Sequence, residues 1–190
     1  MDMKLTLVII LVVLAVFYVI YMRLIRCRNK VQESMADIDV QLKKRYDLIP
    51  NLLHMAAKFM EHEKNIMTQL AEVRTRAMQT TFVGSPKEKM EVESLLNQKL
   101  QDFKFSLENY PDLKSNQTMM TAMQSMNEVE EHIAAARRFY NANVNELKNM
   151  CEIFPSSFVA SLLNITWSAT PFFEATEAER QPVNSKDYFK

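Results

Sequence analysis

The chain has 190 residues, and its 23 Lys and Arg residues balance 23 Asp and Glu residues, which excludes an overall field that would attract nucleic acid or an acidic partner. It contains one glycine and 14 methionines. Sheets and tight hairpins use glycine at their turns, whereas methionine favours helices, so this composition excludes most β folds and predicts an all-α protein.

The first element is an apolar segment near the N-terminus. Residues 5–22 read LTLVIILVVLAVFYVIYM, which is 18 residues without a charge. At a rise of about 1.5 Å per residue they would form a helix of roughly 27 Å, close to the hydrocarbon thickness of a bilayer. Tyr18 and Tyr21 stand near one end, where amphipathic aromatic side chains favour the membrane interface. We expect a transmembrane helix over residues 5–22, preceded by a short extracytoplasmic N-terminus, residues 1–4.

Charges are distributed unevenly around this segment. Four basic residues follow it before the first acid, Glu33: Arg23, Arg26, Arg28 and Lys30. Because basic residues mark the cytoplasmic side of a span, we expect the N-terminus outside and the large domain in the cytoplasm. This membrane-surface basic cluster either attracts anionic lipid headgroups as well or only sets the topology. The competing interpretation, a cleaved signal peptide, calls for a basic leader and a small-x-small cleavage site, which the sequence lacks.

Apolar residues continue beyond the anchor at helical spacing. Steps of three and four residues place the following on one stripe: Leu24, Val31, Met35, Ile38, Leu42, Tyr46 and Ile49. No residue from 22 to 48 breaks a helix, so the anchor and the first cytoplasmic helix are expected to form one rod. Pro50 removes a backbone donor and disfavours helix at the residue before it, which predicts a kink or sharp corner over residues 47–51.

Two further stripes follow the predicted corner. The second comprises Leu52, Ala56, Phe59, Glu63, Ile66, Leu70, Val73 and Ala77. Ser85, Pro86 and Glu88 then form a helix start signal, because serine can cap, proline suits the first turn and the glutamate completes a capping box. The third stripe comprises Val92, Leu96, Leu100, Phe103 and Leu107, and it stops at Pro111.

The fourth stripe is the longest, and either Ser115 or Asn116 can cap its helix. It comprises Met119, Met123, Met126, Glu130, Ile133, Arg137, Tyr140, Val144, Leu147 and Cys151. Alternating steps of four and three match a coiled-coil seam. We expect residues 23–155 to form an elongated, mostly antiparallel bundle of about four long helices, and residues 156–190 to form a short helix and an extended aromatic tail packed on the bundle as a C-terminal strap.

Several polar residues fall where the stripes call for apolar ones, or close to the predicted corner. They are Arg45, Asp47, Asn51, Glu63, Glu130, Arg137 and Asn141. A buried charge without a partner costs several kcal/mol, on the order of 3–5 in measured pairs, so we expect these residues to pair with one another. Such a polar network either fixes the register of the helices or forms a site for a ligand or partner.

The sequence offers little for catalysis. Its three histidines lack the Glu-x-x-His spacing of di-metal bundles, and no phosphate-binding loop or nucleophile elbow is present. Cys27 and Cys151 are too few for a disulfide framework. The arginines around Cys27 could lower its pKa, and at a membrane surface its thiol is either incidental or an acylation site. We therefore expect no enzyme, no metal and no cofactor.

The stretch around Pro50 resembles the LemA family. Residues 39–52 read DVQLKKRYDLIPNL, close to the family pattern DVQLKRRYDLIPNLV, and further matches are Tyr110–Lys114, Ala136–Asn141, Phe154–Pro155 and Pro171–Glu174. The resemblance covers nearly the whole chain. It implies a single-pass protein of the bacterial inner membrane with a helical cytoplasmic domain and no established activity. Some members are associated with internal membrane compartments and some with a membrane metalloprotease.

Two functions fit these expectations. The first is a scaffold that binds membrane lipids, forms a homo-oligomer and organises or shapes the bilayer. The second is an adaptor or binding module for another membrane protein, such as a membrane protease, that uses the polar network or the aromatic tail.

Overall fold

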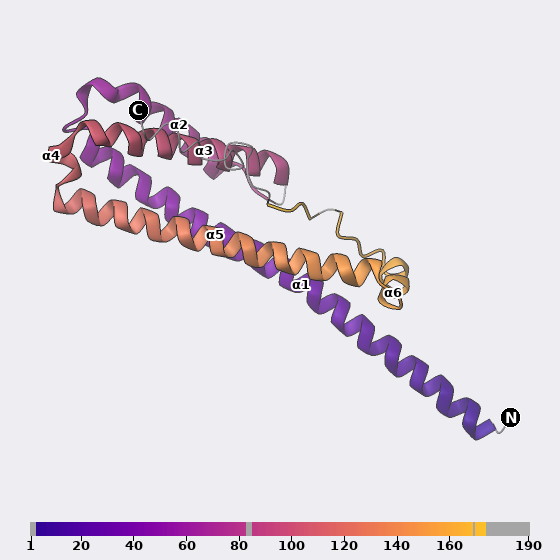
Figure 1. Ribbon diagram of the computed structural model, residues 1–190. Coiled ribbons are helices and arrows are strands. Elements are labelled where there is room, and N and C mark those ends of the chain that lie inside the picture. Colours follow the sequence, from indigo (N-terminus) through magenta and orange to yellow (C-terminus); the bar gives the residue numbers. More distant parts are fainter. Residues whose placement is uncertain (1–2, 83–84, 169, 174–190) are drawn as a thin grey trace, which may run out of the picture.

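The structure is a computed structural model that describes residues 3–82, 85–168 and 170–173. Every regular element within these ranges is helical, which confirms the all-α prediction (Figure 1). The elements are α1 (Met3–Ala56), η1 (Glu61–Glu63), α2 (Lys64–Gln79), α3 (Pro86–Ser106), η2 (Leu107–Asn109), α4 (Pro111–Lys114), α5 (Gln117–Glu152) and α6 (Ser156–Leu162).

The long helices α1 and α5 pack antiparallel along the length of the molecule, and the α2–α3 hairpin covers this pair at the end away from the N-terminus (Figure 1). Helix α6 packs against both α1 and α5 at the other end of the bundle. The N-terminal part of α1 projects beyond α6 as a single helix (Figure 1). The predicted elongated bundle is therefore present, with α1 as its longest element.

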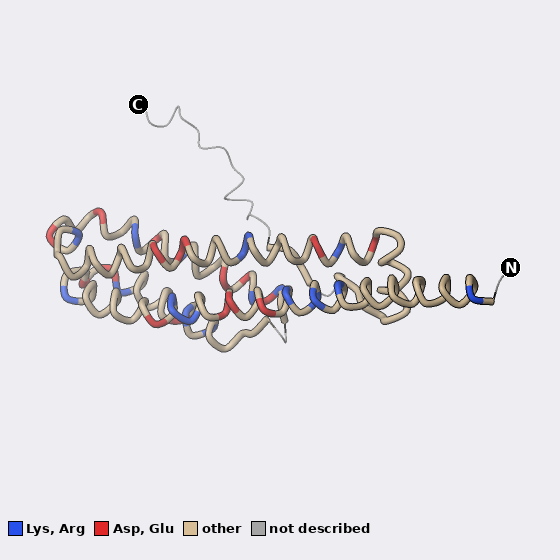
Figure 2. The backbone as a smooth tube through the Cα atoms, turned by 90° about the horizontal axis from the view of Figure 1, so that it is seen from below, with Lys and Arg blue, Asp and Glu red and all other residues tan. Residues whose placement is uncertain are grey.

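The projecting part of α1 contains the apolar segment. An 18-residue window near the N-terminus has the length and composition to cross a membrane, and none of it is buried. Figure 2 shows this end of α1 without charges except at its tip, followed by basic residues where the bundle begins. No break separates the apolar segment from the first bundle helix, which confirms the prediction of one continuous rod.

The corner predicted at Pro50 is wrong, because α1 continues through the proline to Ala56. A proline has no N–H to donate to the carbonyl four residues earlier, here that of Tyr46. Arg74 of α2 replaces the missing donor: its Nε lies 2.6 Å from the Tyr46 carbonyl oxygen. The freed carbonyl is thus satisfied from a neighbouring helix, and α1 does not need to end.

The chain turns later than expected, over residues 57–60. Leu52 and Ala56 are buried as part of α1, and Met60 is buried in the turn itself. Helix α2 begins at Lys64, so the prediction of one helix over residues 52–77 is also wrong.

The next two helices match their predicted stripes. All five residues of the third stripe are buried. Asn116 caps α5, since its side-chain oxygen accepts from the backbone N–H groups of Thr118 and Met119 at 3.0 and 3.3 Å. The most buried residues of α5 include members spaced seven apart, namely Met119, Met126, Ile133, Tyr140 and Leu147.

The segment after α6 returns along α5 toward the tip of the α2–α3 hairpin (Figure 1). Asn141 makes two hydrogen bonds with the backbone of Phe173, at 2.8 and 2.9 Å. The Phe173 ring packs edge-on against Phe82 and Tyr140, with centroids 5.6 and 5.3 Å away. The predicted strap thus lies on the bundle as far as Phe173, and the rest of the predicted tail, residues 174–190, falls outside the described residues.

Candidate functional site

Arg45 lies at the centre of the bundle and is fully buried. It is spaced by multiples of seven residues from Leu24, Ile38 and Leu52, which are also buried, so helix geometry directs it into the core. Its guanidinium donates to Glu93 and Asn97 of α3, the latter at 2.5 Å, and to Glu130 of α5 at 3.1 Å. One side chain of α1 therefore joins three helices.

Glu93 is the acceptor at the middle of this arrangement and is almost fully buried. One carboxylate oxygen accepts from Arg45, and the other accepts from the Tyr46 hydroxyl and from Lys89 Nζ, the last at 3.0 Å. Three donors surround one carboxylate, which is the condition under which a buried charge is tolerated.

Lys89 extends the arrangement to α2. Its ammonium donates to the Tyr46 hydroxyl at 2.8 Å and to the Ala77 carbonyl oxygen at 2.6 Å. Burial, together with the nearby Glu93 carboxylate, raises the pKa of Tyr46 well above its usual range, so the phenol stays protonated. We call Arg45, Tyr46, Lys89, Glu93, Asn97 and Glu130 the buried charge cluster.

The buried charge cluster contains two cations and two anions and is therefore neutral overall. Glu130 keeps part of its side chain exposed, at 30%, so one edge reaches solvent. With Arg74 on the Tyr46 carbonyl, polar contacts connect all four long helices. Most of these polar groups use one another as partners, whereas the buried Nε of Arg45 has no hydrogen-bond partner among the described residues.

Of the predicted network residues, Arg45 and Glu130 form an ion pair with each other. Asp47 is exposed and pairs with Lys43 at 2.5 Å. Asn51 is also exposed and lines a shallow groove between the end of α1 and the start of α5. Glu63 lies in η1, beyond the end of α1.

The remaining two predicted residues hold the strap. Asn141 binds the Phe173 backbone, and the Arg137 guanidinium lies 5.3 Å from the centre of the Phe173 ring. Tyr140 between them donates to the Pro171 carbonyl oxygen at 3.2 Å, and burial raises its pKa to about 12. The aromatic tail is therefore packed at this point.

Sequence reasoning missed Lys89, Glu93 and Asn97, which supply the α3 side of the buried charge cluster. Each lies four residues from its neighbour in this set, and Glu93 and Asn97 directly follow Val92 and Leu96 of the apolar stripe, where polar residues are usually solvated. The seven-residue spacing of Arg45 from apolar positions of α1 indicates that Arg45 is buried. Because a buried cation needs a partner, this spacing also predicts an acidic residue on another helix.

All four residues of the membrane-surface basic cluster are exposed, and Lys30 pairs with Glu146 of α5 at 3.5 Å. Cys27 differs from expectation. Burial between α1 and α5 and the neighbouring Glu146 carboxylate raise its pKa, so the predicted lowering by nearby arginines is wrong. The arginine side chains point to solvent, whereas the thiol faces the core.

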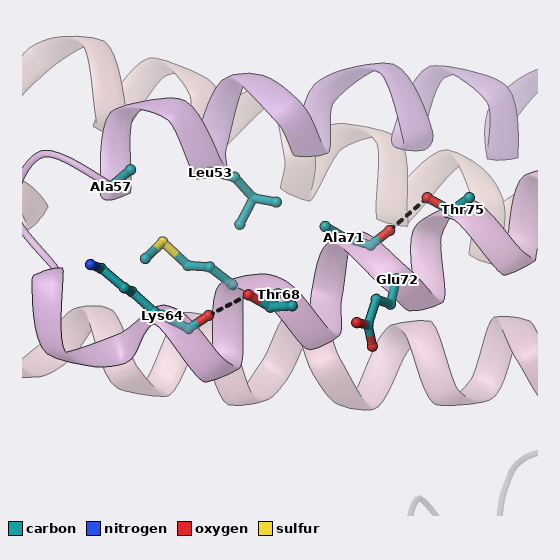
Figure 3. A pocket seen from close by; sticks show the side chains of 8 residues that line it. Leu53, Ala57, Lys64, Thr68, Ala71, Glu72 and Thr75 are labelled. Carbon is teal, nitrogen blue, oxygen red and sulfur yellow. Dashed lines mark hydrogen bonds between the residues drawn. The ribbon is translucent and has the colours of Figure 1, made fainter.

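An open groove lies between α1 and α2 (Figure 3). Leu53 and Ala57 form its α1 side, and residues of α2 form the other. The Thr68 and Thr75 hydroxyls donate to carbonyl oxygens one turn earlier in α2, at 2.8 and 2.9 Å (Figure 3).

Across the part of the chain that the structure describes, no group of three His, Cys, Asp or Glu side chains is placed to hold a metal ion.

Comparisons with known proteins agree with the motifs. A family model described as the LemA family matches residues 34–186. The curated Protein LemA of Metamycoplasma hominis is 22% identical over 179 residues, which cover 92% of this chain and 80% of that relative. The region matched by the family model includes every residue of the buried charge cluster.

Proposed function

The chain belongs to the LemA family, and on that premise we propose that it is a membrane-anchored, non-enzymatic scaffolding protein that self-associates and organises or shapes the membrane. The observation that carries this proposal is the continuity of α1 from an exposed apolar half into the centre of the bundle. A helix without a break transmits the orientation of an anchor to the domain that it carries. The anchor spans the inner membrane, with the bundle in the cytoplasm.

The interior of the bundle supports a structural role. Its ionisable groups form a neutral, mutually paired cluster that joins four helices. The register of the coiled-coil-like seam between α1 and α5 is thereby held, as polar residues do in known helical assemblies. A rigid rod of this kind presents the same flanks along its length to further copies.

Large apolar side chains stand on those flanks. Val40 of α1, Phe105 of α3 and Phe139 of α5 are 53, 74 and 56% exposed. Burial of an aromatic side chain between copies stabilises an assembly by about 1.5–3 kcal/mol. We place self-association on these flanks.

Sedimentation of the detergent-solubilised full-length protein over a range of concentrations tests this proposal. We expect the assembled fraction to rise with protein concentration. Whichever of Phe139 and Phe105 lies in the contact between copies, its substitution, Phe139→Ser or Phe105→Ser, should lower the assembled fraction. Electron microscopy of the protein in lipid should then show ordered assemblies. Strictly monomeric protein at every concentration would contradict self-association.

A second function, an adaptor for another membrane protein such as a protease, is favoured by one specific surface. Leu107, Met119, Met120 and Met123 line a groove at the end of the bundle away from the anchor. Methionine side chains are flexible and polarisable, and they suit surfaces that accept a partner's apolar residues. The buried charge cluster and the packed tail up to Phe173 are less suited to this role because their groups contact the bundle itself.

A photo-crosslinking residue placed at Met120, with one at Val40 as the matched control, separates the two functions. Crosslinks from position 120 to one membrane protein, with none to a second copy of the chain, would favour the adaptor. Crosslinks between copies from position 40 would favour the scaffold.

A further inference from the structure

The α5–α6 corner carries a cluster of strongly exposed apolar side chains outside the N-terminal half of α1. Phe154 is 81% exposed, Phe158 65%, Leu162 63% and Ile153 59%. No charged residue occurs between Glu152 and Glu174. Single exposed apolar residues are ordinary, but a cluster of this size in a stretch without charges marks a contact surface.

The position of this corner along α1 is informative. A groove beside the corner is lined on one side by Ala15, Val19 and Ile20 of the apolar segment, and on the other by Ile153 and Phe154. Phe17 and Ile20 also pack against the core. The corner therefore lies level with the last two turns of the apolar segment (Figure 1).

The length of the apolar segment shows why this overlap matters. Residues 5–14, which are the part of the segment that the corner does not flank, extend only about 15 Å at 1.5 Å per residue. The hydrocarbon core of a bilayer is about 30 Å thick. Residues 15–22 must therefore lie in lipid for α1 to span it, and the corner beside them is carried to the same depth.

The corner is built to tolerate that environment. Exposed backbone groups are excluded from hydrocarbon unless they are paired. The N–H groups of Ser157, Leu163 and Ile165 donate to carbonyl oxygens of Ile153, Val159 and Ala160, at 2.9, 3.1 and 3.0 Å. Val159 and Ala160 face the bundle and are buried, so the other face of α6, with Phe158, Ser161 and Leu162, is directed outward.

We propose that the α5–α6 corner is a second membrane contact, which inserts Phe154, Phe158 and Leu162 among the acyl chains of the leaflet on the bundle's side. The proposal rests on the proposed spanning of the bilayer by α1. Lipid is the occupant because the patch is continuous with the apolar surface of the anchor, lacks charges and lies at the depth where amphipathic helices insert, about 5–10 Å below the headgroups.

Two contacts with the membrane would constrain the bundle more than one. A single spanning helix leaves the domain free to rotate about the helix axis, whereas the corner fixes which face of the bundle lies toward the bilayer. Arg23, which also lines the groove, stands at the level where a long basic side chain reaches the headgroups.

Depth-dependent fluorescence quenching tests the proposal. Trp167, the only tryptophan, is changed to Phe, and single tryptophans are introduced by Phe158→Trp, Val12→Trp or Phe105→Trp in the full-length protein. Each variant is reconstituted in phosphatidylcholine vesicles with or without a nitroxide on the acyl chain, and acrylamide is added separately. Because the three sites are exposed, circular dichroism is expected to show the same helicity for all.

We expect the acyl-chain nitroxide to lower the fluorescence at positions 158 and 12 by about twofold or more, and to leave position 105 at the far end of the bundle unchanged. Nitroxide quenching at position 12 together with acrylamide quenching at position 158 would overturn the proposal, but it would still support the spanning of the bilayer by α1. Absence of nitroxide quenching at both positions would overturn the anchor as well.

Two further outcomes would also overturn the proposal. Protection of position 158 from both quenchers would place a second copy of the chain, rather than lipid, on the corner. Quenching at position 105 as strong as at 158 would mean that the bundle lies flat on the bilayer. Phe154→Trp repeats the measurement on the other side of the corner, so a local defect at one site does not decide the result.

Discussion

Glu93 illustrates how a single buried carboxylate organises the core. It accepts from Arg45, Tyr46 and Lys89, which come from two helices, while Arg45 continues to Glu130 on a third. A pair of this kind contributes modestly compared with a well-packed apolar core, but loss of one partner leaves the other charge buried and unpaired. The role proposed for the cluster is therefore to set helix register rather than to add net stability.

Glu93→Ala is predicted to lower the free energy of unfolding by about 3–5 kcal/mol, because two buried cations lose their shared acceptor. Asp47→Ala, which breaks the exposed pair with Lys43, is the matched control and is expected to cost less than about 1 kcal/mol. Denaturant unfolding of the detergent-solubilised protein measures both. Equal, small losses in the two variants would contradict the role given to the buried charge cluster.

The raised pKa of Tyr140 predicts that the folded protein loses stability at alkaline pH. Burial raises its pKa in the folded protein to about 12 from the usual value of 10.0. The unfolded chain then releases the phenol proton before the folded chain does, so this contribution to stability is complete below pH 10 and is lost as the pH rises toward 12. The loss amounts to at most about 3 kcal/mol.

Tyr140→Phe should make the stability less dependent on pH across that window. Unfolding curves at several pH values from neutral to alkaline check this expectation. An unchanged slope in the variant would show that Tyr140 titrates normally in the folded protein.

The periodicity of apolar residues predicted much of the fold, whereas it did not predict the buried charge cluster. The stripes of α3 and α5 were readable because apolar side chains repeat on one helical face, as Val92, Leu96 and Met126 do. Glu93 and Lys89 were not readable, since a charged residue next to a stripe is usually solvated. Only the packing of α3 against Arg45 makes them core residues, and that packing is a tertiary property.

At the level of the helix, α1 departs from the usual rule for proline. The rule predicts a break at Pro50 because one carbonyl loses its donor and the ring crowds the preceding turn. Arg74, which lies 28 residues after Tyr46 in the chain, donates to the Tyr46 carbonyl oxygen, so the local sequence could not indicate this replacement donor.

The pairing of Pro50 with Arg74 predicts non-additive stability changes. Arg74→Met leaves the Tyr46 carbonyl without its donor and is expected to cost about 1–3 kcal/mol. With Pro50→Ala in the same chain, a restored backbone N–H can bond that carbonyl, so the added cost of Arg74→Met should be smaller. Equal costs in the two backgrounds would show that Arg74 acts only by packing.

The strap is a second element that depends on one side chain. Asn141→Ala removes both hydrogen bonds to the Phe173 backbone, so we expect faster proteolytic cleavage near residues 170–173 with little change in helicity. Asn145→Ala, an exposed position one turn later in α5, is the control and should leave the cleavage rate unchanged. Cleavage at the wild-type rate in both variants would contradict the anchoring role of Asn141.

At the level of the whole molecule, α1 connects its own exposed, apolar N-terminal half to a bundle whose core contains the buried charge cluster. The membrane-surface basic cluster lies where these halves meet, and the α5–α6 corner lies beside the apolar half. An exposed apolar helix, the membrane-surface basic cluster and a helical bundle in this order are what the proposed membrane scaffold requires.

Protease accessibility on the two sides of the membrane tests this account most directly. For the proposed location in an inner membrane, protease added to inverted vesicles should digest the bundle and leave a protected fragment that contains residues 5–22. The same protease added to intact spheroplasts should leave the protein whole. Digestion of the bundle in spheroplasts, or a mature chain that begins after residue 22, would contradict it.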